Sequence, residues 1–176
     1  MATEADTTTA KPMILLVTGV SGSGKTTIGT LLADRLGWTY AEADLFHPEA
    51  NMAKMAQRIP LDDADRGPWL DAIGDWIDAA TEAGTPAVVT CSGLKRAYRD
   101  RLRAGRENVR LVYLDVDQET VAARLAERKE HFFPPELLAS QFRDLEAPTD
   151  GEHVIRVRVD ASPEEVVERV LHLVSE

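Results

Sequence analysis

Short runs of apolar and β-branched residues alternate along this chain with longer stretches in which apolar residues recur at helical spacing. The short runs predict strands at residues 13–18, 38–43, 87–91, 110–115 and 154–159. The longer stretches predict helices at residues 25–36, 48–57, 66–83, 94–104, 118–128, 135–145 and 163–174. Strands that alternate with helices build a parallel sheet covered by helices on both faces, so the pattern predicts an α/β fold.

Composition narrows the class of protein. The chain has 176 residues, 44% of them hydrophobic, which suits one domain over residues 11–176 after a disordered tail at residues 1–10. Its 20 Lys and Arg against 30 Asp and Glu give a net charge of -10. This charge argues against a broad surface for nucleic acid or anionic lipid, so an anionic ligand needs a local basic patch.

The cellular compartment is predicted from what the sequence lacks. Cys91 is the single cysteine, so no internal disulfide can form. No apolar run approaches the roughly 20 residues of a membrane span, and the first ten residues are acidic and rich in threonine. We therefore expect a cytoplasmic protein without a signal peptide or a membrane anchor.

The strongest motif is a phosphate-binding loop. Residues 19–26 read GVSGSGKT and match G-x-x-x-x-G-K-[ST] in full, between a predicted strand and a predicted helix. Glycines let this backbone curl so that successive N–H groups face phosphate oxygens at the positive end of the helix. Lys25 is expected to reach the β and γ phosphates and Thr26 to bind magnesium. The other loop residues assigned to the nucleotide are Gly19, Ser21, Gly22, Ser23 and Gly24.

The loop alone fits a motor, a switch GTPase, a transport ATPase or a small-molecule kinase. A switch GTPase would carry an Asn-Lys-x-Asp-like segment late in the chain, which is missing here. A hydrolytic ATPase would usually place an acid at the end of the strand at 87–91, but that strand runs into Cys91, Ser92 and Gly93. These comparisons favour a small-molecule kinase.

Two carboxylates lie at the end of the second predicted strand. Glu42 and Asp44 are two apart, and in an extended stretch such residues project to the same side. Asp44 would accept the proton of an acceptor hydroxyl, and Glu42 would hold a magnesium-bound water. The plainer alternative is a pair of exposed loop acids in an acidic protein.

Basic residues follow the acid pair. Lys54 and Arg58 are four residues apart and lie on the same side of the predicted helix. That side contacts either a bound anion or solvent. His47 precedes them and is interpreted, on its own, as a local hydrogen-bonding residue.

Two further basic pairs occur later. Lys95 and Arg99 begin the helix after the third strand, where open parallel sheets bind their ligands. Arg124 and Arg128 share a face immediately before the Pro-marked segment HFFPP. This second pair predicts a lid that closes on the phosphates and excludes water, with a simple charged helix end as the alternative.

Four segments together resemble the thermoresistant-type gluconate kinases, small phosphate-loop kinases related to shikimate and nucleoside monophosphate kinases. The segments are GVSGSGKTT, ADLFHPEANMAKMAQRIPLDDADRGPWL, CSGLKRAYRDRLR and RLAERKEHFFPPELLASQFRDLEAP. Part of the last, HFFPPELLASQFRDLEAP, is the most specific. The chain departs from the usual pattern at Ala43, at Gly93 and in the order Leu45-Phe46.

The resemblance implies a fold and an activity. It implies a three-layer P-loop kinase fold with strand order 2-3-1-4-5, a substrate-side insertion at about residues 45–70 and a lid at about residues 124–148. The implied reaction is ATP- and magnesium-dependent phosphorylation of the terminal hydroxyl of D-gluconate. The implied assembly is a homodimer. A kinase for another sugar acid or polyol, and a nucleotide-binding module without turnover, remain alternatives.

The resemblance also assigns residues. It adds Thr27 to the ATP and magnesium site, and it gives Asp44 the acceptor hydroxyl. Arg124 would stack near the adenine and Arg128 would reach the phosphates. The residues implied to grip the polyol and its carboxylate are His47, Arg58, Lys95 and Arg99. Asp65 is interpreted as the cap of the substrate-side helix, with Trp69 in its first turns.

Overall fold

The computed structural model describes residues 11–127 and 135–175. Within them, one parallel sheet has the strand order β2-β3-β1-β4-β5, which confirms the predicted fold class and order. The strands are β1 (Ile14–Thr18), β2 (Thr39–Glu42), β3 (Ala87–Cys91), β4 (Val109–Asp115) and β5 (Ile155–Arg158). The expected tail at residues 1–10 lies outside the described residues, as does Arg128.

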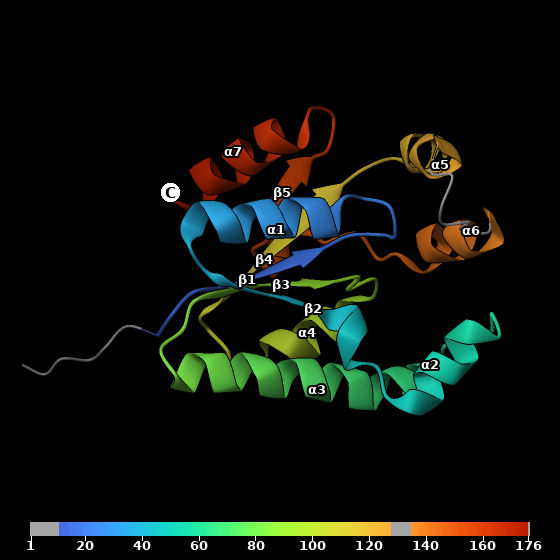
Figure 1. Ribbon diagram of the computed structural model, residues 1–176, viewed down its shortest axis with the longest axis horizontal. Helices are drawn as coiled ribbons and strands as arrows, with labels where there is room; N and C mark the ends of the chain where they lie inside the picture. Colours follow the sequence, from blue (N-terminus) through green and yellow to red (C-terminus); the bar gives the residue numbers. More distant parts are fainter. Residues whose placement is uncertain (1–10, 128–134, 176) are drawn as a thin grey trace, which may run out of the picture.

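Helices cover both faces of the sheet (Figure 1). They are α1 (Lys25–Leu36), α2 (Glu49–Ala56), α3 (Asp63–Glu82), α4 (Arg96–Arg103), α5 (Gln118–Glu127), α6 (Pro135–Asp144) and α7 (Pro163–Val174), with short 3-10 turns η1 (Ala43–Phe46) and η2 (Asp150–Glu152). Figure 1 shows α1 and α7 on one face, α3 and α4 on the other, and α2, α5 and α6 beyond the carboxyl ends of the strands. In the described part of the chain, no helix is both long and apolar enough to cross a bilayer.

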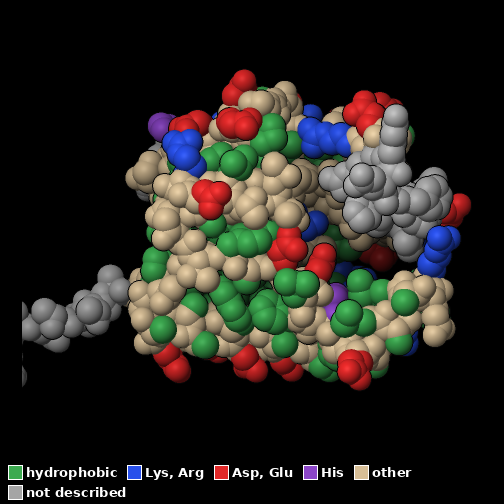
Figure 2. Space-filling model, viewed as in Figure 1, with side chains coloured by type: hydrophobic (Ala, Val, Ile, Leu, Met, Phe, Trp, Pro, Cys, Tyr) green, Lys and Arg blue, Asp and Glu red, His purple; other side chains and the backbone are tan. Residues whose placement is uncertain are grey.

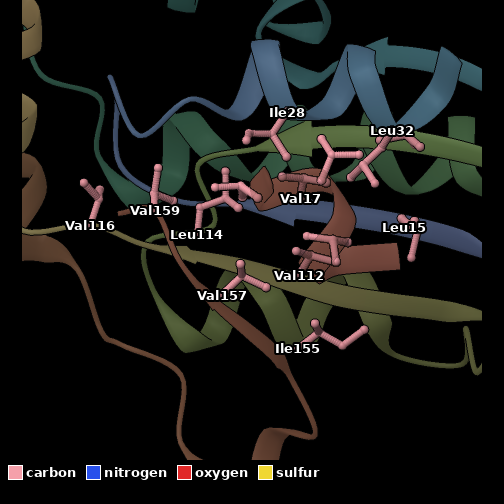
Figure 3. Close-up of a cluster of buried hydrophobic side chains, with 14 of the residues drawn as sticks. Leu15, Val17, Ile28, Leu32, Val112, Leu114, Val116, Ile155, Val157 and Val159 are labelled. Carbon is pink, nitrogen blue, oxygen red and sulfur yellow. The ribbon is translucent and has the colours of Figure 1, made fainter. Parts of the chain in front are cut away.

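Burial on both faces explains why the central strands are apolar runs rather than alternating patterns. Leu15 and Val17 of β1 pack in the cluster beneath α1 and α7, together with Ile28 and Leu32 of α1 (Figure 3). The intervening residues of β1 pack with α3 and α4 on the opposite face. The two clusters hold β1 rigid up to the point where the phosphate loop begins.

The second strand ends earlier than the sequence predicts. It covers Thr39–Glu42, and the chain then turns into η1. Ala43 is buried, and its carbonyl oxygen accepts a hydrogen bond from Trp69 Nε1 at 2.7 Å. Asp44 therefore lies in the first turn of η1 instead of continuing an extended strand.

The start of α3 corrects a second expectation. The helix begins at Asp63, three residues before the predicted start, and its N-cap is Asp62 rather than Asp65. Asp62 Oδ1 accepts from the backbone N–H of Asp65 at 2.7 Å, and Asp65 Oδ2 accepts from the backbone N–H of Asp62 at 3.0 Å. This capping box starts the helix early, although Pro68 inside the helix makes the sequence favour a later start.

Candidate active site

The phosphate loop ends at a helix terminus that is prepared for an anion. Gly24 caps α1 in the left-handed conformation, with φ of 99°, and no side chain caps this helix. The first turn of α1 also holds no acidic residue, whereas α3 and α7 have side-chain caps and acids in their first turns. The partial positive charge and the N–H groups at the start of α1 are thus left for a ligand, which suits a phosphate.

Lys25 lies folded over its own loop. The half-buried side chain donates hydrogen bonds from Nζ to the carbonyl oxygens of Gly19 and Val20, at 2.9 and 3.0 Å. Burial lowers the pKa of Lys25, while the negative charges of Asp44 and, more weakly, Glu42 act in the opposite direction. The ammonium group and both carboxylates of the predicted acid pair therefore lie in one electrostatic environment.

Glu42 is held by a tyrosine that sequence reasoning missed. Tyr40 donates a hydrogen bond from its hydroxyl to Glu42 Oε1 at 2.8 Å. Burial, and then the bond to Glu42, raise the pKa of Tyr40 to about 12, with the hydroxyls of Thr90 and Thr26 acting against this shift. The phenol is therefore a protonated donor at neutral pH, and Thr26, the predicted magnesium ligand, lies beside the Tyr40–Glu42 pair.

His47 is fixed by stacking and by one hydrogen bond. Its ring lies on Trp69 with centroids 4.4 Å apart and planes 10° from parallel, and Asn51 Nδ2 lies 3.2 Å from His47 Nδ1. Burial lowers the pKa of His47, and Arg66 adds to this effect while Asp44 opposes it. A neutral ring that accepts from Asn51 at Nδ1 carries its proton at Nε2.

Arg66 joins the site from the beginning of α3, and sequence reasoning assigned it no role. Arg66 Nη1 donates to the hydroxyl of Tyr98 at 2.9 Å, and that hydroxyl donates to Asp63. Lys95 Nζ lies 3.0 Å from Asp63 Oδ1, so the predicted ligand Lys95 belongs to the same cluster. The positive charge of Arg66 also helps to lower the pKa of His47.

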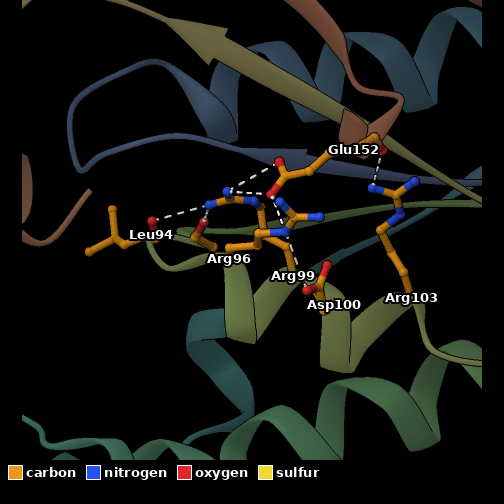
Figure 4. Close-up of polar contacts among 7 residues, drawn as sticks. Leu94, Arg96, Arg99, Asp100, Arg103 and Glu152 are labelled. Atoms are coloured by element: carbon orange, nitrogen blue, oxygen red, sulfur yellow. Dashed lines mark hydrogen bonds and ion pairs between the residues drawn. The ribbon is translucent and has the colours of Figure 1, made fainter. Parts of the chain in front are cut away.

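Arg99 does not have the position expected of a substrate ligand. Its side chain is 1% exposed, and Nη2 donates to both carboxylate oxygens of Glu152, at 2.9 and 3.2 Å (Figure 4). Its Nη1 donates to the carbonyl oxygens of Gly93 and Leu94, at 2.8 and 3.1 Å. The buried guanidinium thus holds the backbone of the loop after β3. The prediction that Arg99 binds the substrate is therefore corrected to a structural role.

Lys54 and Arg58 separate in space despite their helical spacing. Lys54 Nζ forms an ion pair with Asp65 at 2.7 Å, which ties α2 to the start of α3. Arg58 follows α2 in the left-handed backbone region, with φ of 60°, and its side chain is exposed. The two residues do not form the joint anion site that their spacing allowed.

A cavity of about 400 Å³ lies at the start of α5, next to the loop after β5. Its lining consists of Val116, Asp117, Thr120, Arg124, Arg158, Val159, Asp160 and Ala161. Arg124 therefore faces a hollow whose size suits a nucleotide base, whereas the predicted phosphate ligand Arg128 lies outside the described residues.

Helix α6 contacts the phosphate loop directly. Gln141 Oε1 accepts a hydrogen bond from the backbone N–H of Ser21 at 2.7 Å. Just after the helix, the backbone N–H of Glu146 donates to the carbonyl oxygen of Leu94 at 2.7 Å. The space-filling view shows the surface hollowed between α2 and the α5–α6 pair (Figure 2). Among the described residues, no three His, Cys, Asp or Glu side chains gather as a metal site.

A phosphate loop after β1, an acid pair at the end of β2 and helices around the carboxyl end of a parallel sheet define a small P-loop kinase. A family model described as an AAA domain matches residues 14–149. The gluconokinase of Gluconobacter oxydans (strain 621H) is 48% identical over 161 residues, which cover 92% of this chain and 90% of that protein. The chain belongs to the gluconokinase family.

Solved structures agree with this assignment. A sugar kinase from Janibacter sp. HTCC2649 superposes with a TM-score of 0.87 and 44% identity, over 93% of this chain and 95% of that chain. A gluconokinase from Sinorhizobium meliloti 1021 superposes with a TM-score of 0.85 and 38% identity, over 93% and 92% of the two chains.

Proposed function

We propose that this protein transfers the γ-phosphoryl group of ATP to the terminal hydroxyl of D-gluconate and releases 6-phospho-D-gluconate and ADP. The observation that carries this proposal is the placement of Asp44 in the environment of Lys25, at the uncapped end of α1, in a member of the gluconokinase family. A phosphate bound at the helix end is proposed to meet both the lysine and the carboxylate.

The nucleotide is proposed to bind along the carboxyl edge of the sheet. Residues 19–27 hold the phosphates, with Thr27 in the first turn of α1, and the cavity beside Arg124 takes the adenine. Lys25 is proposed to leave the carbonyl oxygens of its own loop for the β and γ phosphate oxygens. Arg128 is proposed to add a positive charge near the phosphates.

Magnesium is proposed to accompany the nucleotide. The donors present here, the Thr26 hydroxyl and the Glu42 carboxylate, are of the kind that bind Mg²⁺ together with phosphate oxygens and water. The ion supplies charge neutralisation to the transferring phosphoryl group when it is bound. Thr26 would contribute its hydroxyl, and Glu42 would accept from metal-bound water.

Asp44 is proposed as the general base. As the acceptor oxygen bonds to the γ-phosphorus and the bond to the ADP oxygen breaks, the hydroxyl proton passes to the Asp44 carboxylate. His47 is proposed to donate from Nε2 to a substrate hydroxyl, and Arg66 and Lys95 to attract the gluconate carboxylate. Arg58 remains a proposed outer contact of the substrate.

We further propose that the protein works in the cytoplasm as a homodimer and supplies 6-phosphogluconate to the pentose phosphate pathway. Light scattering of the purified protein tests the dimer. We also propose that residues 11–176 form one domain, in which residues 45–70 serve the acceptor and residues 124–148 serve as a lid.

Coupled detection of ADP tests the proposed activity. Purified protein with ATP and MgCl₂ should form ADP when D-gluconate is added, and not with shikimate or nucleoside monophosphates. A panel of other aldonates separates a gluconate kinase from a kinase of broader specificity. ADP formation on another aldonate but not on gluconate would refute the proposed substrate.

A further inference from the structure

Tyr40 and Glu42 lie two residues apart on the edge strand β2, so both side chains project from the same face of the sheet. Both are half-buried, and the Tyr40 hydroxyl donates to Glu42 Oε1 at 2.8 Å. A glutamate side chain has several rotamers, and fixing one of them costs conformational entropy. The tyrosine therefore orders the carboxylate in the folded protein before any ligand binds.

The packing of α1 fixes the tyrosine in turn. A Cβ atom at Gly29 would lie 2.7 Å from Thr90 Cγ2 and 3.0 Å from Tyr40 Cε2, so glycine lets α1 approach the sheet at this point. The Tyr40 ring thus packs directly against α1, one turn from Thr26. The Thr26 and Thr90 hydroxyls lie beside the phenol.

We propose that Tyr40 is a positioning residue for the metal–nucleotide complex, and that its hydroxyl holds Glu42 in the orientation that serves magnesium-bound water beside Thr26. This inference rests on the proposed ATP and magnesium site, but not on gluconate as the acceptor. Removal of a group that orients a metal ligand from outside the coordination sphere commonly weakens metal binding about 10- to 100-fold. Tyr40 is expected to act in the same way, one water molecule further from the ion.

Manganese binding tests this role without turnover. Free Mn²⁺ is measured by electron paramagnetic resonance in titrations of the protein saturated with ADP, because Mn²⁺ shares the oxygen ligands of Mg²⁺. Tyr40→Phe keeps the ring against α1 and removes the donor, and urea unfolding checks that the variant is folded. Tyr113→Phe removes a phenol from β4 and is the matched control.

Tyr40→Phe should weaken Mn²⁺ binding about tenfold, which is the effect commonly seen when a group that orients a metal ligand is removed. Glu42→Gln should weaken it at least as much, and the double variant should match Glu42→Gln alone, because the hydroxyl acts through the carboxylate. Tyr113→Phe should leave the affinity unchanged.

Unchanged Mn²⁺ affinity in Tyr40→Phe would overturn the inference. The inference would also be overturned if adding Tyr40→Phe to Glu42→Gln weakened Mn²⁺ binding by the same factor as Tyr40→Phe does in the wild-type protein. Because no gluconate is present, a protein that fails to phosphorylate gluconate still gives this comparison. Failure of the positioning role and failure of the proposed activity are therefore distinguishable.

Discussion

The guanidinium of Arg99 and the carboxylate of Glu152 form a buried ion pair, with N–O distances of 2.9 and 3.2 Å between residues 53 positions apart in the chain. Glu152 is 4% exposed and lies in η2, just before the last strand, whereas Arg99 lies on α4. Since Arg99 also donates to the carbonyl oxygens of Gly93 and Leu94, the pair connects the loop after β3 to the segment that precedes β5.

Breaking this pair should cost stability rather than substrate affinity. Arg99→Met removes the two short hydrogen bonds of the buried Glu152 carboxylate and leaves it the longer ion pair with Arg96 Nε at 3.4 Å, which should lower the free energy of unfolding by about 3–5 kcal/mol. Adding Glu152→Leu should recover part of that loss. Urea unfolding followed by circular dichroism measures both effects. Unchanged stability together with a raised KM for gluconate would return Arg99 to a substrate-binding role.

Asp44→Asn tests the general base. The amide cannot accept the hydroxyl proton, so kcat should fall by about 10²- to 10⁴-fold, the range that general-base catalysis contributes. ATP affinity, measured by calorimetry, should stay nearly the same because the phosphate loop is intact. A variant with unchanged turnover would remove Asp44 from the proton transfer.

Arg66→Met tests the arginine that the structure brings to the site. Loss of a charged hydrogen bond to the substrate carboxylate should raise the KM for gluconate about 10- to 100-fold, with little change in the KM for ATP. Arg101→Met is the matched control, because Arg101 pairs with Asp71 on the exposed surface between α3 and α4. Equal effects of the two substitutions would argue that Arg66 has no specific part in binding.

Arg124→Ala tests the proposed adenine cavity. Removing a cation beside the base should raise the KM for ATP about three- to tenfold, while the KM for gluconate stays within twofold. Arg143→Ala on α6 removes a highly exposed arginine and serves as the control. An unchanged KM for ATP in Arg124→Ala would place the base elsewhere.

The strands of the sheet could be predicted because each is encoded in a short run of neighbouring residues. The apolar runs gave the strands, the loop motif placed the anion site at α1, and the family resemblance gave the strand order. The start of α3 was missed because Pro68 obscures a helix that an Asp62–Asp65 capping box begins. Such boundaries depend on side-chain geometry that spacing does not show.

Contacts with residues distant in the chain decide which basic side chains could bind a substrate. Arg66 and Arg99 both stand near the beginning of a helix, and spacing favoured Arg99. The structure instead buries Arg99 on Glu152, while Arg66 reaches Tyr98 and acts on the pKa of His47. Tyr40 received no role from the sequence beyond its place in a predicted strand, since its bond to Glu42 and its packing against Gly29 appear only after folding.

Gluconate phosphorylation through Asp44 is tested most directly by measuring ADP formation by the purified protein with ATP and MgCl₂, in the presence and absence of D-gluconate, with Asp44→Asn in parallel. We expect gluconate-dependent ADP formation in one-to-one ratio with 6-phosphogluconate, and its near loss in Asp44→Asn. Folded, ATP-binding protein that forms no ADP on addition of gluconate would contradict it.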